Sequence, residues 1–370
     1  MNTFISKELY QREQKIYFTR HLLKWNELVN KRQMPWKGEK DPYKIWLSEI
    51  ILQQTRVEQG WAYYEKFIKA FPSIQKLAKA ADEKVFKLWE GLGYYSRCKN
   101  LLATARKIST EYKGKFPDSY EEIVALKGVG PYTAAAIASF AYNLPYAVVD
   151  GNVMRVLSRY FGMETPVDST QGKKIFQQIA ADCLPGNKAG IYNQAIMDFG
   201  ATVCKPQNPI CKECLLKKKC IAFGKGKVSE LPVKEKSIQK KERWFYFLVI
   251  QIKDKVYVKK REGKDVWENL YEYVTLEIQS QMDAATFIKS PVFKKSIGSR
   301  TFEIKSISKI YRQLLSHQTI YGRFITITVS KPLKHLKGYV LADKNDIKQF
   351  AFPRLINNWH EDGHKDSVLF

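Results

Sequence analysis

The sequence LKGVGPYTAA, at residues 126–135, determines the fold of the first half of the chain. Its glycines, Gly128 and Gly130, allow a tight turn and a close approach of the backbone to a ligand. Pro131 suits the first position of a helix, whose free N–H groups can hold a phosphate. With a helix on either side, this pattern is typical of a helix-hairpin-helix motif, which binds the DNA backbone without reading the base sequence.

The residues around the hairpin have a helical pattern. From Lys15 to about Phe223, apolar residues recur every three or four positions between turn and cap signals. Asp41 and Pro42 fit a helix N-cap followed by proline at the first helical position. Further helices are expected to begin near Thr55, Ala81, Ser96, Ser119, Pro131, Gly151, Gln171 and Ala189. The first half is therefore predicted to be all-α.

The pattern changes after residue 224. Residues 225–243 contain seven lysines and arginines against three glutamates, with little apolar periodicity, and predict a linker near a polyanion. A buried-strand pattern follows at 244–250, and further strands are expected at 256–258, 271–274 and 324–329. We therefore predict a helical domain over 1–224, a basic linker over 225–243 and an α+β domain over 244–370.

The composition indicates an acidic partner. The 370 residues include 62 lysines and arginines against 37 aspartates and glutamates, which gives a formal charge of +25. Such a charge favours DNA, RNA or an acidic membrane as partner. Since no stretch is apolar enough to span a bilayer and the first ten residues lack a signal-peptide core, we expect no membrane association and a cytoplasmic location.

Four of the six cysteines form a cluster in the sequence. Their spacing is C-x6-C-x2-C-x5-C, and they are Cys204, Cys211, Cys214 and Cys220. Because cytoplasmic thiols stay reduced, the cysteines indicate a metal site and not a disulfide framework. Four thiolates so close together fit either one tetrahedral zinc ion or one iron–sulfur cubane. Cys98 and Cys183 lie far away and are expected to be ordinary buried residues.

Basic residues lie near the predicted sites. Lys205, Lys212 and residues 217–219 are interspersed with the cysteines and either contact phosphates or are simply solvated. Arg155 and Arg159, one helical turn apart, are expected to approach phosphates or to pair with acids. These side chains are candidates for DNA contacts.

Two carboxylates are candidates for catalysis. Glu49 lies in the apolar run WLSEIIL, at 46–52. A pocket there would raise its pKa, as a general acid near neutral pH requires, but an exposed place on the polar face of a helix fits the pattern equally well. Asp150 precedes Gly151 and a new helix, where an N-cap is the commoner role and is compatible with facing an active site.

Together these residues resemble the MutY family of adenine DNA glycosylases, in the endonuclease III superfamily. The resemblance extends from about Lys31 to about Pro353. It is carried by six ordered segments: 34–36, 48–55, 91–97, the hairpin, 149–156 and the four cysteines. It implies a helix-hairpin-helix glycosylase domain with a [4Fe–4S] cluster held by those cysteines, followed by a Nudix-like domain that recognises 8-oxoguanine.

The resemblance also implies catalytic roles. Glu49 would protonate the adenine leaving group, and Asp150 would stabilise the cationic sugar left as the glycosidic bond breaks, as in other sugar hydrolysis. Asn152 would help to position Asp150. Tyr132 stands where bifunctional relatives carry the lysine that forms a Schiff base, so strand cleavage is expected to be weak or absent.

An enzyme that acts on a stacked base must first extrude it from the duplex. Gln54 and Tyr94 match the family positions that wedge into the duplex and fill the gap. Arg32, Trp36 and Gln194 match positions around the extruded adenine, although Trp36 also fits an ordinary core residue.

In the second half, Ser316 and His317 match the loop that touches the lesion in this family. Leu315 precedes them, where many relatives have phenylalanine. The sequence has no Nudix catalytic box, so this domain is expected to bind and not to hydrolyse.

The predicted function is the excision of adenine opposite 8-oxoguanine or guanine in double-stranded DNA, by a bacterial enzyme that works on the nucleoid as a monomer. One alternative is a thymine mismatch glycosylase of the same superfamily, although such relatives typically lack a second domain. Another is an iron–sulfur DNA-binding protein without chemistry, which the presence of both carboxylates disfavours.

Overall fold

The computed structural model describes residues 2–235, 240–298 and 300–363, with the side chains of the first helix described from Arg12 onward. Internal contacts divide the chain into two compact units. Unit 1 comprises Met1–Lys79 and Asn100–Ser237, and unit 2 comprises Ala80–Lys99 and Ile238–Phe370. Residues 80–99, which the sequence pattern assigns to the helical half, thus make their contacts with the C-terminal unit.

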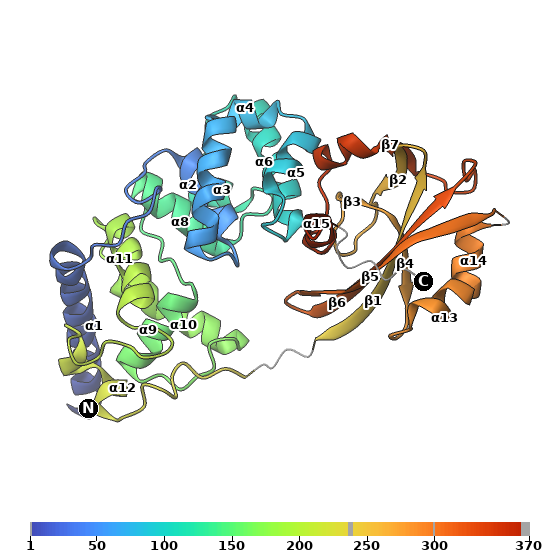
Figure 1. Ribbon diagram of the computed structural model, residues 1–370. Coiled ribbons are helices and arrows are strands. Elements are labelled where there is room, and N and C mark those ends of the chain that lie inside the picture. The colour runs from blue at the N-terminus through green and yellow to red at the C-terminus, as the bar shows by residue number, and fades with distance from the viewer. Residues whose placement is uncertain (1, 236–239, 299, 364–370) are drawn as a thin grey trace. The chain divides into compact units, whose positions relative to one another are not determined.

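Unit 1 consists of helices (Figure 1). They are α1 (Asn2–Leu28), α2 (Pro42–Leu52), α3 (Val57–Ala70), α4 (Ile74–Ala78), most of α6 (Tyr95–Glu111), α7 (Tyr120–Val124), α8 (Pro131–Tyr142), α9 (Gly151–Phe161), α10 (Thr170–Cys183), α11 (Ala189–Thr202), η1 (Lys217–Lys219) and α12 (Ile221–Gly224). The predicted helices begin within two residues of the expected positions, which confirms the all-α prediction for this unit. In the described part of the chain, no helix combines the length and the apolar character that a membrane crossing needs.

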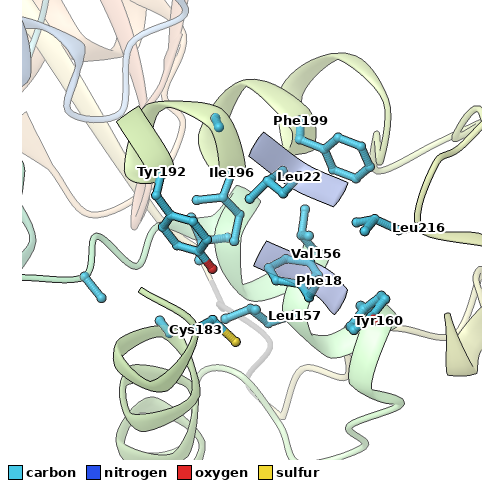
Figure 2. Packing of buried hydrophobic residues seen from close by; sticks show 14 of the residues in the cluster. Phe18, Leu22, Val156, Leu157, Tyr160, Cys183, Tyr192, Ile196, Phe199 and Leu216 are labelled. Atoms are coloured by element: carbon cyan, nitrogen blue, oxygen red, sulfur yellow. The ribbon is translucent and has the colours of Figure 1, made fainter. Parts of the chain in front are cut away.

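The core of unit 1 forms where α1, α9, α10 and α11 meet. Phe18 and Leu22 of α1 pack with Val156 of α9 and with Tyr192 and Phe199 of α11, all at most 1% exposed (Figure 2). Burial of large apolar side chains is the main source of stability in such a bundle. This core fixes α9 and α11, which both contribute residues to the site described below.

The hairpin has the predicted form. Gly128 has a φ of +79°, which favours glycine, and a Cβ there would lie 2.7 Å from the Cβ of Asn100. Thr104 donates a hydrogen bond to the carbonyl of Lys127 (2.8 Å). Pro131 then begins α8. The turn is therefore shaped by its glycine and tied to α6.

Part of the segment that was expected to be a linker packs on unit 1. Leu231 is buried, and the backbones of Val233 and Val167 are joined by a hydrogen bond of 3.0 Å. Residues 241–243 already belong to strand β1 (Lys241–Ile252), and residues 236–239 lie outside the described residues. Residues 225–235 therefore follow the surface of unit 1.

Unit 2 is built on a mixed seven-stranded sheet. The strands follow the order β3-β2-β1-β6-β5, with β4 paired to β1 and β7 to β2. β1 and β6 (Gln318–Val329) are parallel, and the other pairs are antiparallel. The remaining strands are β2 (Lys255–Lys260), β3 (Tyr271–Glu272), β4 (Val274–Ile278), β5 (Phe302–Leu314) and β7 (Val340–Asp343). Strands lie at the four expected positions, although the one expected at 271–274 is divided at Tyr273 into β3 and β4, and β5 and β7 were not predicted.

Helices cover both faces of this sheet. Alternate residues of β1 point to opposite faces, and Tyr246 stacks on Phe287 of α13 at 3.6 Å between ring centroids. On the other face, Phe324 stacks on Trp359 of α15 at 4.4 Å. The helices of this unit are α5 (Asp82–Trp89), the start of α6, α13 (Ala284–Lys289), α14 (Pro291–Ile297), η2 (Lys344–Gln349) and α15 (Arg354–Glu361). The second half is therefore α+β, as predicted.

Candidate active site

A cavity of about 470 Å³ in unit 1 collects eight of the predicted site residues, including all four predicted catalytic ones. Its lining includes Arg32, Trp36, Glu49, Gln54, Tyr132, Asp150, Asn152 and Gln194. These side chains come from α2, α8, α9 with its N-cap, and α11, and from the loops before and after α2. The hairpin glycines, Gly128 and Gly130, do not line this cavity. Segments far apart in the sequence thus supply one pocket.

Glu49 is buried in the wall of this cavity, with 6% of its surface exposed. It lies on α2, which Asp41 caps by accepting a hydrogen bond from the Tyr43 N–H (2.9 Å). Burial raises the pKa of Glu49 to about 7, the charge of Asp150 adds to the rise, and a hydrogen bond from Tyr132 opposes it. Of the two places that the sequence left open for Glu49, the structure shows the buried one.

Asp150 is the N-cap of α9 and also lines the cavity. One carboxylate oxygen accepts from the Val153 N–H (2.7 Å), and the other accepts from the Asn152 amide (2.7 Å). Two hydrogen bonds hold the carboxylate in one orientation and leave lone pairs for a ligand. A fixed anion beside the cavity can stabilise positive charge that develops there.

Arg155 connects this carboxylate with the cysteine segment, which sequence analysis did not anticipate. Its guanidinium donates to the Asn152 side-chain oxygen (2.8 Å), to the Gly200 carbonyl (2.9 Å) and to the Cys204 carbonyl (2.9 Å). Asn152 in turn donates to Asp150. Arg155 therefore positions the side chain of Asn152, instead of approaching phosphates or pairing with an acid.

Arg159 anchors the cysteine segment in a similar way. It is 3% exposed and donates to the carbonyls of Lys205 (2.7 Å), Pro206 (3.1 Å) and Leu231 (2.9 Å). Its Nη1 also lies 3.5 Å from the sulfur of Cys204. Burial of an arginine is costly unless its donors are used, and here they bind backbone carbonyls.

The four clustered cysteines line one cavity, together with Arg159 and apolar side chains such as Phe199 and Leu216. Among the described residues, no three histidine, cysteine or acidic side chains are arranged to hold a single metal ion. Cys98 and Cys183 are buried elsewhere, as expected. The four predicted cysteine ligands thus line one cavity, but in the described residues they are not grouped closely around a single metal position.

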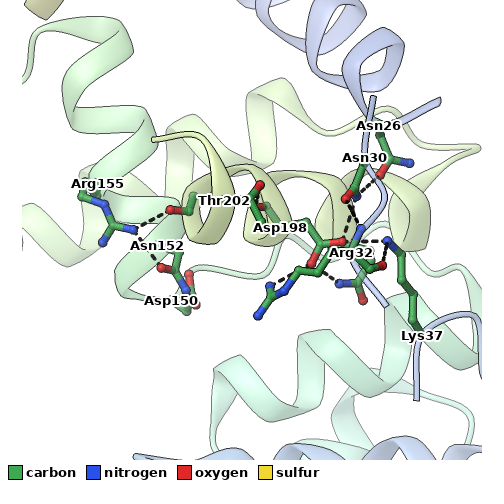
Figure 3. A network of polar contacts seen from close by, with 11 residues as sticks. Asn26, Asn30, Arg32, Lys37, Asp150, Asn152, Arg155, Asp198 and Thr202 are labelled. Atoms are coloured by element: carbon green, nitrogen blue, oxygen red, sulfur yellow. Dashed lines mark hydrogen bonds and ion pairs between the residues drawn. The ribbon is translucent and has the colours of Figure 1, made fainter. Parts of the chain in front are cut away.

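A buried aspartate that the sequence analysis missed lies behind the cavity wall. Asp198 is 0% exposed and forms ion pairs with Arg32 and Lys37, both at 3.0 Å. It also accepts hydrogen bonds from Asn30 (2.9 Å) and Gln194 (3.0 Å) (Figure 3). The signal in the sequence was an acidic residue between Met197 and Phe199, inside an apolar helix.

Unit 2 contains a second cavity, of about 280 Å³. It is lined by Tyr94, Trp267, Ser316 and His317 among others, and the hydroxyls of Tyr94 and Ser316 are hydrogen-bonded. Tyr94 has a φ of +47° and is 42% exposed. The structure therefore brings three predicted DNA-contacting residues together in this unit, whereas Gln54 lines the cavity of unit 1.

Comparisons with known proteins agree with this geometry. Residues 47–181 match the model of the HhH-GPD superfamily of base excision DNA repair proteins. The chain is 34% identical to the adenine DNA glycosylase of Buchnera aphidicola subsp. Baizongia pistaciae, over 85% of this chain and 87% of that protein. The chain belongs to the adenine DNA glycosylase family. A member from Rattus norvegicus is 40% identical over 58% of this chain and 44% of its own length.

Two solved structures resemble part of this family member. A thermostable thymine-DNA glycosylase superposes with a TM-score of 0.54 and 29% identity, over 58% of this chain and 98% of that one. An endonuclease III trapped on DNA superposes with a TM-score of 0.51 and 19% identity, over 58% and 98%. These similarities show the helical glycosylase fold. Sequence similarity to the Buchnera enzyme, in contrast, covers most of both chains.

Proposed function

We propose that this adenine DNA glycosylase removes adenine paired with 8-oxoguanine or guanine, with Glu49 as general acid and Asp150 as the anion that stabilises the sugar cation. Membership of the family makes the chain a base excision repair enzyme that acts on adenine in DNA. The observation that carries the mechanism is the shared cavity: a buried Glu49 with a pKa of about 7 and an oriented Asp150 line the same space.

The chemistry follows from these two environments. Near neutral pH a large fraction of Glu49 is protonated, so it can give its proton to a ring nitrogen of adenine. The glycosidic C–N bond then breaks with both electrons going to the base, and positive charge develops on the sugar beside Asp150. A water adds to that sugar and releases a proton. Two carboxylates with different environments thus divide the acid and anion roles.

Tyr132 supports a monofunctional reaction. It hydrogen-bonds to Glu49 at the position where the Schiff-base lysine of bifunctional relatives is expected. Burial raises the pKa of this phenol well above its usual value, so it stays neutral and cannot act as an amine nucleophile. We infer that base removal proceeds without cleavage of the DNA strand.

The extruded adenine would occupy the unit 1 cavity, with Arg32, Trp36 and Gln194 around it. The glycine turn at Gly128 and Gly130 would hold the DNA backbone through the N-terminus of α8. Gln54, at a φ of +56°, and Tyr94 would fill the gap in the duplex. Of these side chains, Gln54 and Tyr94 are exposed, whereas Trp36 is buried in the wall of the cavity.

We further propose that Cys204, Cys211, Cys214 and Cys220 hold a [4Fe–4S] cluster. All four line one cavity. Their C-x6-C-x2-C-x5-C spacing, after the helices of unit 1, resembles the cluster loop of this family and favours the cluster over zinc. When bound, the cluster would cross-link the segment that Arg155 and Arg159 anchor. Its role would therefore be to stabilise the fold.

The second unit would read the base opposite adenine. Its α+β sheet with helices on both faces is compatible with a Nudix-like domain, and Ser316 and His317 present polar groups at its cavity. A thymine-DNA glycosylase structure matches only 58% of this chain over 98% of its own length, so we infer that unit 2 supplies something that base removal alone does not need. We assign to it the recognition of 8-oxoguanine.

One assay tests the proposed function. Purified protein is incubated with duplexes that contain adenine opposite 8-oxoguanine, adenine opposite guanine, or thymine opposite guanine, and released base is measured. We expect release from the first two, fastest opposite 8-oxoguanine. Release of thymine alone would favour the thymine glycosylase alternative, and binding without release from any duplex would favour a non-catalytic DNA-binding protein. Size measurement in solution tests the expected monomer, at work in the bacterial cytoplasm on nucleoid DNA.

A further inference from the structure

We propose that Asp198 is a positioning residue that sets the base specificity of the cavity, because it turns the amide of Gln194 so that its carbonyl oxygen can accept a hydrogen bond from the amino group of adenine. This inference rests on the proposed function. Asp198 itself does not line the cavity and would touch neither the base nor the sugar.

The Asp198 carboxylate is fully committed to four donors. One oxygen accepts from Arg32 and from Gln194, each at 3.0 Å. The other accepts from Asn30 at 2.9 Å and pairs with Lys37 at 3.0 Å. A buried carboxylate with this set of donors stays in place, since every lost partner would leave a charge unpaired.

This carboxylate decides the orientation of the Gln194 amide. An ionised carboxylate only accepts hydrogen bonds, so the group of Gln194 that faces Asp198 must be the NH₂. The carbonyl oxygen on the other arm of the planar amide then points away from Asp198. Among the described residues this oxygen has no hydrogen-bond partner, and Gln194 lines the cavity.

The carbonyl oxygen of Gln194 selects for a particular kind of base edge. Adenine carries an exocyclic amino group, which donates, where a 6-oxopurine carries a carbonyl, which accepts. An acceptor on the protein is therefore complementary to adenine and opposes a 6-oxopurine. Without Asp198 the amide could rotate and present either group, so the preference would be lost.

The test measures base release under single-turnover conditions from duplexes that contain adenine, unsubstituted purine or hypoxanthine opposite 8-oxoguanine. In the full-length Asp198→Asn variant, we expect the rate ratio of adenine to purine to fall about tenfold and hypoxanthine to gain relative to adenine. Each ratio is compared between variants, so the different intrinsic stabilities of the glycosidic bonds cancel. A uniform loss on all three bases would show a merely structural role and overturn the proposal.

Two further variants control for folding and charge. Thr202→Val removes a hydrogen bond to the Asp198 backbone carbonyl (2.8 Å) and leaves the carboxylate intact, so its ratios should match the wild type. Asp198→Asn combined with Lys37→Met restores the local charge if Asp198→Asn alone unfolds, with Lys37→Met as its reference. The combined variant should still lose the adenine preference, and unchanged ratios would contradict the proposal.

The Gln194→Leu variant completes the test. It should show the same reduced ratio, and adding Asp198→Asn should then change the ratio no further. An additional change in the double variant would show that Asp198 acts through another residue. If wild-type protein releases no adenine from any duplex, the proposed function fails, whereas adenine release with an unchanged ratio in Asp198→Asn defeats only this inference.

Discussion

Glu49 and Asp150 line the same cavity, although one lies on α2 and the other caps α9. Burial and then the charge of Asp150 raise the pKa of Glu49, while Tyr132 opposes the rise through a hydrogen bond. The Asp150 carboxylate accepts hydrogen bonds from Val153 and Asn152, which fix its orientation. Cleavage of a glycosidic bond requires a proton donor and a fixed anion, and the environments of Glu49 and Asp150 suit these two roles.

The raised pKa predicts a pH dependence of both activity and stability. Because the fold favours the protonated form of Glu49, the stability it contributes is present below about pH 4.5 and is lost as the pH rises through about 7. The loss amounts to roughly 3 kcal/mol for a shift of this size. Single-turnover release of adenine should fall over the same upper range, as the general acid loses its proton.

Urea unfolding from pH 4.5 to 8 checks this prediction. The free energy of unfolding of the wild type should decrease with pH relative to that of Glu49→Gln, which has no proton to lose. Glu58→Gln, at an exposed position of α3, should follow the wild type. Parallel curves for the wild type and Glu49→Gln would show that Glu49 has an ordinary pKa.

Arg155→Met should slow catalysis without weakening DNA binding. It removes the donor that holds Asn152, so Asp150 loses its fixed orientation, and a misplacement of this kind costs roughly tenfold to a hundredfold in rate. Arg159→Met is the matched control, since it also releases the cysteine segment but has no contact with Asn152. Both variants should unfold more readily, and only Arg155→Met should have a slow single-turnover rate. Equal rates in the two would rule out positioning by Arg155.

Removal of a cysteine ligand should reduce cluster binding. Purified wild-type protein is expected to be yellow-brown, with iron and acid-labile sulfide in a fixed ratio. Cys211→Ser should lower both contents together, whereas Cys98→Ser should leave them unchanged because Cys98 lies apart from the cluster cavity. Colourless protein with stoichiometric zinc would contradict the iron–sulfur assignment.

The combined variant Ser316→Ala/His317→Ala should lose discrimination between lesions. These residues line the unit 2 cavity, so their removal should lower the rate opposite 8-oxoguanine by several-fold to about tenfold and spare the rate opposite guanine. His335→Ala is the control, because that ring contacts the carbonyl of Ser296 and lies away from this cavity. An unchanged preference in the combined variant would place lesion recognition elsewhere.

Local patterns predicted the fold well where they act over a few residues. The Asp41 and Pro42 start signal and the glycine turn at Gly128 are encoded by neighbouring residues, and helices begin where expected. The burial of Glu49 was not decidable in this way, because its exposure depends on α8 and α9, which pack from elsewhere in the chain. The sequence allowed both a buried and an exposed place for Glu49 and could not decide between them.

Residues that act through long-range contacts escaped prediction for the same reason. Asp198 acquires Arg32 and Lys37 as partners only through the tertiary fold. Arg155 reaches Asn152 one helical turn away, but also the carbonyl of Cys204, which no local pattern reveals. The assignment of residues 80–99 to unit 2 is likewise a matter of packing.

The most direct test of the mechanism compares wild type and Glu49→Gln on a duplex with adenine opposite 8-oxoguanine, with base release and DNA affinity measured side by side. The general-acid role predicts a loss of at least about a hundredfold in the single-turnover rate. DNA affinity should be nearly unchanged, and Glu58→Gln should behave as the wild type. Full activity of Glu49→Gln would remove Glu49 from the reaction and contradict the proposed mechanism.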